Sequence, residues 1–550
     1  MDGRYLRDLD PADVSIVRIL EERADRAPDS VFFTWHDTMV TVGEFNRTVN
    51  RTARNLAAKG VGNGTHVVIV MDTSPDYLAV WFALAKLGAV EVPVNTAYHG
   101  EILRHQIVTG RATFGIVDAH YVSRVVDLGS EVPALADVVV RGGSLPDATH
   151  KRWHAFDDLL AEADDDNLDI EVRYDSVAGV IFTSGTTGPS KGVQLSHHYQ
   201  AAYGLMYAEV NRLRDDDVIF NFMPFFHVSG KFLTIATLAM NARMHLKERL
   251  SISTFWDDIR SFGVTNFIAV GGVCNMLLAQ PPHPDDSNTS VRTVYAVPDP
   301  ADIHREFEQR FGCSMTTVFG STEVGLPIFR SPEDGYSPGS CGRQSPYYEV
   351  KIVDDRDQEV PVGTSGEIVV RSKLPYLLGS GYIGMPEQTV EAWRNLWFHS
   401  GDRGRVDADG WFWFVDRSSD SMRRRGENIS SFEVETLVCQ HPSVAEAVVV
   451  ATPSSVGEDE VWALVKVRDG MHVEPQELME HCASVMPYFM IPRYYDIVEE
   501  FPRTPTAKVE KYKIRKAGPG PNTWDREAHG WHLRRRELVY DPDDGGVTRA

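Results

Sequence analysis

The sequence is poor in cysteine, and its five cysteines are scattered without any C-x-x-C pair. This spacing excludes a disulfide framework and argues against a zinc site, so we expect reduced thiols and a cytoplasmic protein. The segment from Met1 to Pro11 carries charges and lacks the apolar run of a secretory signal. The longest apolar run, Tyr77 to Leu87, contains Lys86 and is too short to cross a bilayer. We therefore predict that it forms a buried helix and that the protein has no stable membrane insertion.

The sequence also has fewer basic than acidic residues. Lysine and arginine number 55 against 78 aspartates and glutamates, which gives a formal net charge of −23. Nucleic acid is excluded as the main partner, because binding it requires a basic surface that neutralises phosphates. Apolar residues make up 43% of the chain, as in ordinary globular proteins, and 550 residues are too many for one core. We expect several domains, and the sequence predicts no particular oligomeric state.

The first part of the chain alternates helical and strand patterns. Val67 to Met71 is a continuous apolar run typical of a buried parallel strand. It lies between two predicted helices, Thr41 to Lys59 and Tyr77 to Leu87. Such alternation predicts an α/β fold with doubly wound layers, which at this length would form two subdomains.

Beyond Gly335 the pattern changes to short β runs separated by Gly, Pro and Asp turns, which predicts a small antiparallel β unit. A polar segment then precedes a new pattern of strands and helices, which predicts a small α+β domain. Past Gly518 the tail is rich in Pro and Gly and then in charge. We therefore predict an N-terminal domain over residues 1–416, a hinge at 417–420, a C-terminal domain over 421–516 and a partly disordered tail over 517–550.

The most informative stretch is Phe182 to Gly192, where a strand pattern runs into a loop of glycines and hydroxyls that ends in Lys191. Glycines let backbone N–H groups approach an anion closely, and the hydroxyls and the lysine complete a polyphosphate cradle. The loop differs from the common P-loop, because Lys191 is followed by Gly192 and not by Ser or Thr. An ordinary surface turn is the alternative, but eleven consecutive residues that suit one chemistry favour a nucleotide loop.

This stretch resembles the phosphate-binding signature of the adenylate-forming superfamily, which includes acyl-CoA ligases, peptide-synthetase adenylation domains and luciferases. Other motifs follow in that family's order over about residues 15–516: Phe225-Phe226-His227, Phe319-Gly320-Ser321-Thr322-Glu323, Ser400-Gly401-Asp402, Asp416-Arg417 and Pro502-Arg503-Thr504 through Lys508. Pro189-Ser190-Lys191 and Arg423 to Ser430 look most like carnitine/crotonobetaine-type CoA ligases.

The resemblance implies a two-step ligase reaction that uses ATP and Mg²⁺. A carboxylate attacks the α-phosphate and expels pyrophosphate, and the thiol of CoA then attacks the acyl-adenylate and releases AMP. Both steps need charge neutralisation, alignment of the nucleophile and exclusion of water. The loop residues that would hold the phosphates are Thr183, Ser184, Gly185, Thr186, Thr187, Gly188 and Lys191.

The other motifs would hold the metal and the rest of the nucleotide. Glu323 would bind Mg²⁺, which prefers oxygen ligands that it shares with phosphates, and Thr322 would contact the α-phosphate. Phe319 stands where the family often has Tyr and would stack on adenine. Asp402 would accept hydrogen bonds from both ribose hydroxyls. Two further residues would contact the nucleotide: Ala296, in a segment where relatives often have Gly-Gly-Ala-Pro, and Arg417, near the ribose or α-phosphate.

The C-terminal motifs would complete catalysis. Lys508 would donate hydrogen bonds to the substrate carboxylate and the α-phosphate, although Ala507 stands where the family usually has Gly. Ser419 would be the hinge that moves the small domain between the two steps. In the second step the segment Arg424, Arg425 and Gly426 would reach the large domain, with its arginines meeting CoA phosphates; a solvated basic run is the alternative.

Lys231 is the unusual residue of the expected acid pocket. It lies four residues after His227, which would act as a gate and positioning group, and a helix over Val228 to Thr234 would place both side chains on one face. With Gly271 and Val297, that face would line the pocket, where an unpaired ammonium is unfavourable. Lys231 either pairs with a second anionic group of a small polar acid, such as an aromatic or dicarboxylic acid, or pairs with a protein carboxylate or reaches solvent.

Three other functions remain open at this stage. The same body can load an acid onto the pantetheine of a carrier protein. Some relatives in natural-product pathways activate nitrite and use the adenylate to diazotise an aryl amine, whose carboxylate Lys231 would then hold. A catalytically silent nucleotide-binding protein is the alternative of another class, and the presence of Lys191, Glu323, Asp402 and Lys508 argues against it.

Overall fold

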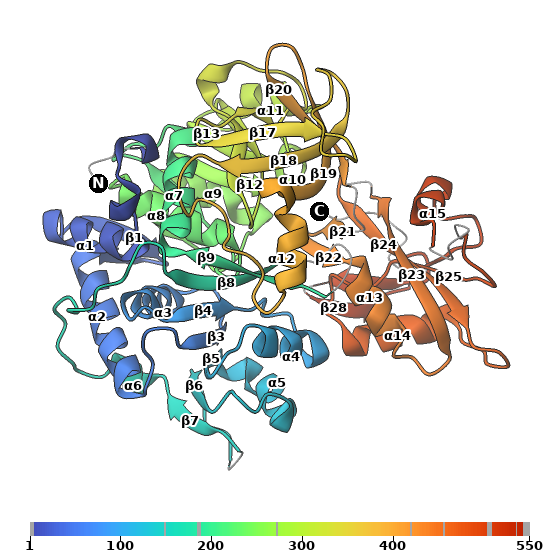
Figure 1. Ribbon diagram of the computed structural model, residues 1–550, viewed down its shortest axis with the longest axis horizontal. Helices are drawn as coiled ribbons and strands as arrows, with labels where there is room; N and C mark the ends of the chain where they lie inside the picture. The colour runs from blue at the N-terminus through green and yellow to red at the C-terminus, as the bar shows by residue number, and fades with distance from the viewer. Residues whose placement is uncertain are drawn as a thin grey trace. The chain divides into compact units, whose positions relative to one another are not determined.

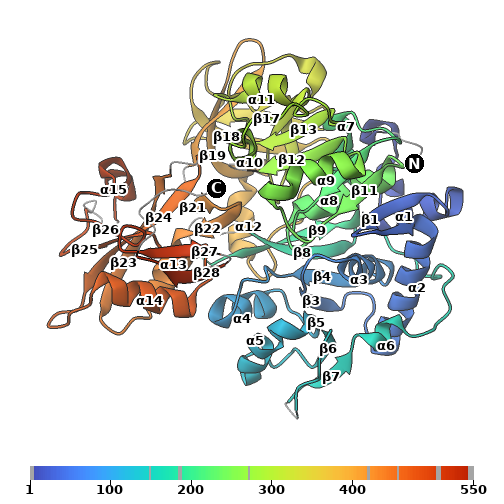
Figure 2. The ribbon, with the colours of Figure 1, turned by 180° about the vertical axis from the view of Figure 1, so that it is seen from behind.

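The computed structural model describes residues 5–147, 150–183, 189–270, 273–417, 421–454, 457–502, 509–534 and 536–542. The chain forms two compact units. The larger unit contains Leu103–Phe182, Gly192–Asp416 and the described residues up to Thr96, and the smaller unit contains Ala97–Ile102, Thr183–Lys191 and the described residues from Arg417 onward. Figures 1 and 2 show the elements of each unit from opposite sides.

The first sheet of the larger unit has seven strands in the order β7-β6-β5-β3-β4-β8-β9, and β3 to β8 pair in parallel. Its middle strand is apolar on both faces because helices cover the sheet, and Val67 to Val70 are fully buried. The strands are β3 (His66–Val70), β4 (Val90–Pro93), β5 (Phe114–Asp118), β6 (Asp137–Arg141), β7 (Arg152–Ala155), β8 (Val177–Thr183) and β9 (Lys191–Ser196), and the helices between them are α3 (Pro75–Lys86), α4 (Gly100–Thr109), α5 (Val122–Asp127) and α6 (Asp157–Leu160).

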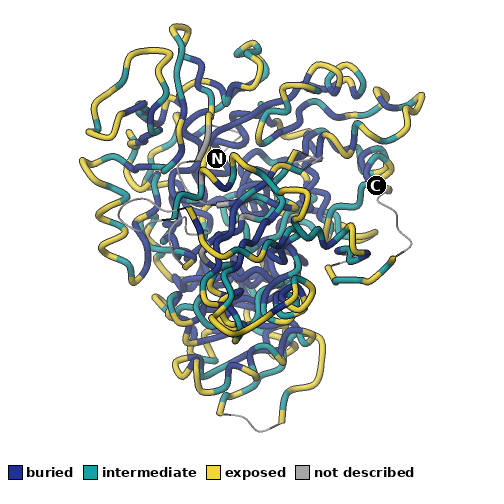
Figure 3. The backbone as a smooth tube through the Cα atoms, turned by 90° about the vertical axis from the view of Figure 1, so that its right-hand side faces the viewer, coloured by how far each residue is buried: buried dark blue, intermediate teal, exposed yellow. Residues whose placement is uncertain are grey.

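The helix predicted around residues 77–87 is α3, and its ends follow from local chemistry. Ser74 accepts a hydrogen bond from the N–H of Tyr77, and Pro75 occupies the first turn, where no donor is needed. The apolar residues of α3 are buried on all sides of the helix. Figure 3 shows how buried and exposed residues are distributed along the chain. The structure thus gives this run the role of a core helix, as predicted. No described helix has both the length and the apolar character needed to cross a membrane.

The second sheet has thirteen strands in the order β17-β18-β19-β20-β16-β15-β14-β13-β12-β10-β11-β1-β2. In this order the strands from β14 to β1 pair in parallel. The pairs β14-β15, β15-β16, β16-β20, β17-β18 and β18-β19 are antiparallel. The strands are β1 (Val31–Trp35), β2 (Thr38–Thr41), β10 (Val218–Asn221), β11 (Arg243–Leu246), β12 (Asn266–Val270), β13 (Thr293–Val297), β14 (Ser314–Ser321), β15 (Gly325–Arg330), β16 (Gly342–Gln344), β17 (Tyr348–Val353), β18 (Gly366–Ser372), β19 (Phe398–Val406) and β20 (Trp411–Arg417).

The helices associated with this second sheet include α7 and α8, which pack against each other (Figure 1). The predicted antiparallel β unit is present as β16 to β20, but its strands continue the parallel sheet through β15. The α/β fold class is therefore confirmed. The helices are α1 (Ile16–Arg26), α2 (Val42–Ala58), α7 (His197–Asn211), α8 (Val228–Ala239), α9 (Phe255–Phe262), α10 (Val273–Leu278), α11 (His304–Phe311) and α12 (Pro386–Ala392).

The smaller unit is built on a sheet in the order β23-β24-β25-β26, with two separate hairpins, β21-β22 and β27-β28. Its elements are β21 (Ser421–Arg424), β22 (Glu427–Ser430), α13 (Ser431–Val438), β23 (Val444–Pro453), β24 (Asp459–Val467), α14 (Pro475–Val485), β25 (Tyr494–Ile497), α15 (Lys511–Ala517), β26 (Trp524–Asp525), β27 (Trp531–Arg534) and β28 (Glu537–Tyr540).

Within the tail that the sequence predicts to be partly disordered, the described residues form β26, β27 and β28. Trp524 packs against Tyr495 with ring centroids 5.7 Å apart, and Trp531 against Tyr540 at 5.0 Å. Leu533 is buried in the core of this unit. These apolar contacts provide the burial that a charged, Pro- and Gly-rich composition does not indicate.

Candidate active site

Four predicted site residues of the larger unit lie at one edge of the second sheet: His227, Val297, Thr322 and Glu323. Strands β10, β12, β13 and β14 are parallel neighbours, so their carboxyl ends lie together. Val297 ends β13 opposite Val270 of β12, while Thr322 and Glu323 directly follow β14. His227 precedes α8, in the loop that leaves β10. Ligands of open α/β sheets bind at this edge, so the fold places the acid and metal residues where a substrate site is expected.

Glu323 is held in place by several elements. Its side chain is buried, and the phenol of Tyr382 donates a hydrogen bond to its Oε1 (3.1 Å). Its backbone carbonyl accepts from the N–H of Gly379 (2.7 Å), and Tyr199 donates to the preceding carbonyl, that of Thr322 (2.7 Å). Burial raises the pKa of Tyr382, and the nearby Glu323 raises it further, so Tyr382 remains a donor. The Glu323 carboxylate is thereby fixed at the carboxyl edge.

Magnesium fits this donor set. Mg²⁺ takes one or two carboxylates and completes its shell with substrate phosphates and water, so a single buried glutamate is sufficient. Elsewhere among the described residues, Asp72, Asp118 and His120 bring three potential ligand atoms together. Both oxygens of Asp118 accept hydrogen bonds from Arg141, at 2.6 and 2.9 Å, so this cluster is an ion-pair network of the first sheet. Glu323 remains the metal ligand that we propose.

Asp299 anchors the segment predicted to meet adenine and lies two residues after Val297. Its carboxylate accepts hydrogen bonds from His304 Nδ1 (2.7 Å), the N–H of Gly339 (3.2 Å) and other donors. These donors include Arg330 Nη2 at 3.3 Å and the Tyr336 hydroxyl at 3.4 Å. Asp299 was assigned no role from the sequence. Its position after an apolar strand and a proline was the available signal, because a carboxylate there needs hydrogen-bond donors from the protein.

The pair of His304 and Asp299 makes the stability of this segment depend on pH. Burial alone would lower the pKa of His304, but hydrogen bonds to Asp299 and Glu308 raise it above its ordinary value. The imidazolium therefore stabilises the folded state fully below pH about 6.5, and this contribution is lost as the pH rises through the higher folded pKa. We expect the difference in free energy of unfolding between the wild type and His304→Gln to shrink as the pH rises from 6 to 9.

His66 provides a control of opposite sign. Burial lowers its pKa, so its contribution to stability is present at high pH and is lost as the pH falls. Denaturant titrations of His304→Gln and His66→Gln at several pH values would measure both effects. A pH-independent difference for His304→Gln would contradict the assigned ion pair.

The predicted nucleotide residues of β14 and β19 are both buried. The ring of Phe319 is stacked on that of Phe414, with ring centroids 6.5 Å apart. Asp402 lies on β19 after Gly401, whose φ of 71° suits only glycine well. The N–H of Asp402 donates to Ser400 Oγ (3.1 Å). These two residues keep the predicted adenine and ribose roles as proposals.

Several predicted site residues lie outside the part of the chain that the structure describes. They are Ser184, Gly185, Thr186, Thr187, Gly188, Gly271, Ser419 and Lys508, together with the side chain of Arg417. The two ends of the phosphate loop are described. Thr183 ends β8 and Lys191 begins β9, and the Thr183 hydroxyl donates to the Lys191 carbonyl at 3.5 Å. The loop therefore connects two strands whose ends lie close together.

Lys231 does not meet solvent and pairs with a protein carboxylate, which is the second of the two interpretations from sequence. Its Nζ lies 2.7 Å from Oε2 of Glu91 on β4, and both side chains are buried. Sequence reasoning missed Glu91. The signal was an acid inside the apolar strand Val90–Pro93, because a buried charge requires a partner. The hypothesis that Lys231 binds a second anionic group of the substrate therefore has no specific support.

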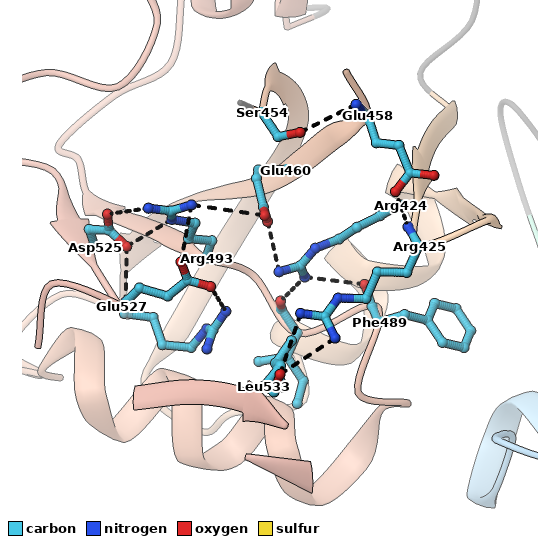
Figure 4. A network of polar contacts seen from close by, with 12 residues as sticks. Arg424, Arg425, Ser454, Glu458, Glu460, Phe489, Arg493, Asp525, Glu527 and Leu533 are labelled. Carbon is cyan, nitrogen blue, oxygen red and sulfur yellow. Dashed lines mark hydrogen bonds and ion pairs between the residues drawn. The ribbon is translucent and has the colours of Figure 1, made fainter. Parts of the chain in front are cut away.

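The hairpin β21-β22 carries the residues predicted to meet CoA. Arg424 is buried; its Nη1 donates to the carbonyls of Phe489 (3.3 Å) and Ile491 (2.8 Å), and its Nη2 lies 2.7 Å from Glu460. Figure 4 shows this guanidinium inside the smaller unit. Arg424 is therefore not placed to meet a CoA phosphate in this structure, which corrects its assigned role.

Arg425 and Gly426 form the turn of the hairpin, both with positive φ. Their successive N–H groups donate to the two carboxylate oxygens of Glu458, at 2.6 and 3.1 Å. The Arg425 guanidinium donates to the carbonyl of Leu533 at 3.4–3.5 Å, as Figure 4 shows. Arg425 is exposed, so of the two arginines it keeps the proposed contact with CoA, and the predicted role of Gly426 in the same segment stays a proposal.

Comparison with known proteins identifies the family of the chain. The chain matches the AMP-binding enzyme family over residues 20–383 and the AMP-binding enzyme C-terminal domain over residues 433–508. It is 30% identical over 485 residues to a crotonobetaine/carnitine–CoA ligase of Proteus mirabilis, which covers 86% of this chain and 92% of that protein. A ligase of the same name from Escherichia coli is 28% identical over 491 residues, with the same coverage.

Solved structures share the fold. A double mutant of o-succinylbenzoate CoA synthetase from Bacillus subtilis has a TM-score of 0.79 at 24% identity, and the match covers 90% of this chain and 98% of that one. An amide bond synthetase from Marinactinospora thermotolerans has a TM-score of 0.79 at 24% identity, covering 92% and 99%. The family match, the curated relatives and the fold define an adenylate-forming enzyme, an AMP-forming acid–thiol ligase. The chain belongs to the AMP-binding enzyme family, as its motifs predict, and within it is similar to the carnitine-type CoA ligases.

Proposed function

We propose that this protein activates a small carboxylic acid with ATP and transfers the acyl group from the adenylate to the thiol of CoA. The observation that carries the proposal is the convergence of His227, Val297 and Glu323 at the carboxyl edge of one parallel sheet. The curated relatives named above, which are named for the ligation of crotonobetaine or carnitine to CoA, support both the acid and the acceptor.

Each residue has one task in this proposal. Glu323 would hold Mg²⁺, which neutralises charge on the phosphates and aligns them for attack. Thr322 would hold the α-phosphate, and Asp402 the ribose. Lys191 would neutralise the leaving pyrophosphate, and Lys508 would stabilise charge between the carboxylate and the α-phosphate. His227 would close the acid pocket on the side from which the thiol enters.

The acid is expected to be short, because aromatic side chains fill the space below Val297. Tyr295 points to the same side of β13 as Val297, since side chains two apart on a strand share a face. Its ring lies 4.9 Å from that of Tyr207 on α7, and Phe232 on α8 lies 5.0 Å from Tyr207 and 4.7 Å from Tyr203. This aromatic cluster is buried between β13 and the two helices, so we expect it to exclude a long acyl chain from this space.

Opening the aromatic cluster should lengthen the preferred acid. In Phe232→Ala, we expect the ratio of kcat/KM for a medium-chain acid to that for a short acid to rise about tenfold or more, because each accommodated methylene is worth about 1–3 kcal/mol. Phe220→Ala is the matched control, since this buried ring packs in a different cluster around Phe255. A ratio unchanged in Phe232→Ala would contradict the assigned pocket floor.

The environment of Lys231 gives no reason to expect a dicarboxylic acid in place of a monocarboxylic acid as the substrate. Its charge is balanced by Glu91 at 2.7 Å, so the pocket needs no second anion from the substrate. The same pairing removes the specific support for an aryl amine whose carboxylate Lys231 would hold. Nitrite activation is therefore retained as an outcome of the test and not as a second proposal.

The test follows AMP and pyrophosphate release by purified protein while one component is varied at a time. Acid-dependent release with a thioester on free CoA is the expected result. If release requires a carrier protein, the acceptor is the pantetheine of that protein and not CoA. If release requires nitrite and no CoA, the protein is a diazotising enzyme. An absence of turnover with every component would overturn the proposal in favour of a nucleotide-binding protein.

A further inference from the structure

The ion pair of Glu91 and Lys231 joins elements that belong to different sheets. Glu91 lies on β4 of the seven-stranded sheet, whereas Lys231 lies on α8, which packs on β10 and β11 of the thirteen-stranded sheet. Nζ and Oε2 are 2.7 Å apart, and the side chains are 3% and 0% exposed. The pair is thus a fixed polar contact between the two α/β layers of the larger unit.

On the α8 side, the pair adjoins the predicted acid pocket. The Nζ of Lys231 lies 4.1 Å from the ring centroid of Trp81 and 5.3 Å from that of Tyr77. Tyr77 in turn contacts Phe225, with ring centroids 5.2 Å apart. Phe225 belongs to the Phe-Phe-His motif, and His227 caps the helix one turn before Lys231. A displacement of Lys231 would therefore move the residues predicted to line the acid pocket.

On the β4 side, the pair adjoins the strand that leads into the phosphate loop. Glu91 is the register partner of Gly179 on β8, and β8 reaches the loop four residues later at Thr183. A Cβ on Gly179 would lie 2.9 Å from Glu91 Cγ and 3.0 Å from Gln200 Nε2. The backbone of β8 therefore packs directly against the Glu91 side chain without space for any other residue.

We propose that Glu91 and Lys231 are positioning residues that set the distance between the phosphate-loop strand and helix α8, which begins directly after His227. The proposal rests on the proposed function, because alignment matters only if the acid and ATP react between these elements. A shift of about 1 Å between the carboxylate and the α-phosphate can reduce the rate about 100-fold. The pair would therefore act on the rate of adenylation and not on ATP affinity.

Energetics favour a positioning role over a stabilising one. Apolar side chains of similar volume often replace a buried ion pair with no loss of stability, because two charges no longer need to be removed from water. Removal of one partner alone is different, since it leaves an unpaired buried charge. If stability were the purpose of the pair, leucine and methionine would serve equally well at positions 91 and 231.

The first experiment is the double variant Glu91→Leu/Lys231→Met, measured by thermal unfolding and by acid-dependent ATP–pyrophosphate exchange. We expect a melting temperature close to that of the wild type, a kcat reduced about tenfold or more, and a KM for ATP changed by less than about threefold. A double variant that is stable and has wild-type kcat would overturn the proposal.

Lys86→Met is the matched control. Lys86 is also a buried lysine of the larger unit, paired with Glu21 at 2.6 Å and hydrogen-bonded to Asn46 and Asn50. Its replacement should lower the melting temperature and leave kcat unchanged. An equal loss of kcat in Lys86→Met would show that general destabilisation explains the effect, and this outcome would also overturn the proposal.

Gly179→Ala tests the same contact without removal of a charge, because the added methyl group must displace Glu91 or Gln200. Gly115→Ala on β5 is its control, since the added Cβ would meet only side chains at ordinary distances of 3.4–3.5 Å. We expect kcat to fall about tenfold in Gly179→Ala and to stay within about twofold in Gly115→Ala. Equal activity in both glycine variants would contradict the proposal.

A last readout separates this proposal from the proposed function. If the wild type itself shows no acid-dependent exchange, the proposed function fails, and amide hydrogen exchange then tests the pair alone. The double variant should show faster exchange in residues 179–183 and 228–233 than the wild type and Lys86→Met show. Unchanged protection of both segments would overturn the positioning role whatever the reaction is.

Discussion

Replacement of Glu323 by glutamine is expected to lower the kcat of acid-dependent ATP–pyrophosphate exchange by about 100-fold or more. The amide keeps the volume of the side chain and can still accept the hydrogen bond from Tyr382, so the fold should be unaffected. It removes the negative charge that would bind Mg²⁺, and loss of one electrostatic contact in a transition state typically reduces kcat about 10²–10³-fold. Steady-state exchange at several Mg²⁺ concentrations measures the effect.

Tyr382→Phe is the control for this prediction. It removes the hydrogen bond to Glu323 but leaves the carboxylate, so we expect less than about a tenfold loss of kcat and no change in the Mg²⁺ requirement. If Glu323→Gln retains a rate within about threefold of the wild type, the assignment of Glu323 to the metal is wrong.

Arg424→Ala is expected to reduce the free energy of unfolding of the smaller unit by about 3–5 kcal/mol. The variant leaves the carbonyls of Phe489 and Ile491 without this donor and Glu460 without its nearest cation. Burial raises the pKa of Glu460 and Arg424 opposes that rise, so the carboxylate depends on the guanidinium. A denaturant titration monitored by hydrogen exchange in β23 and β24 would locate the loss.

Arg468→Ala is the matched control for Arg424. Its guanidinium makes one hydrogen bond at the surface, to the carbonyl of Pro442, so we expect a change within about 0.5 kcal/mol. The network around Arg424 also includes Arg493, whose guanidinium lies 3.0 Å from Asp525 (Figure 4). Arg424→Ala with normal stability would contradict the structural role and return this arginine to the predicted contact with CoA.

The fold could be predicted from the sequence because its strands and helices have strong local patterns. The run Val67 to Met71 is typical of a covered parallel strand, and Ser74 and Pro75 mark the start of α3 without tertiary information. The C-terminal segment could not be predicted in the same way. Its order depends on contacts that are distant in sequence, such as the hydrogen bond from Arg425 to Leu533.

The site shows the same division between local and distant information. Roles for Glu323 and Asp402 could be proposed from sequence because their motifs are contiguous, and the structure places Glu323 at the carboxyl edge. The partner of Lys231 could not be identified, because Glu91 is 140 residues away and pairs with it only through the packing of two sheets. The sequence could show that a buried ammonium needs an anion, but not whether the protein or the substrate provides it.

The central claim is that the carboxylate oxygen of an acid attacks the α-phosphate of ATP in this protein. The most direct measurement uses an acid labelled with ¹⁸O in its carboxylate and analyses the AMP that is released after thioester formation. The account predicts one ¹⁸O atom in the phosphate of AMP and none in pyrophosphate, because the attacking oxygen stays with the α-phosphorus when the thiol displaces AMP. AMP without the label, or label in pyrophosphate, would contradict it.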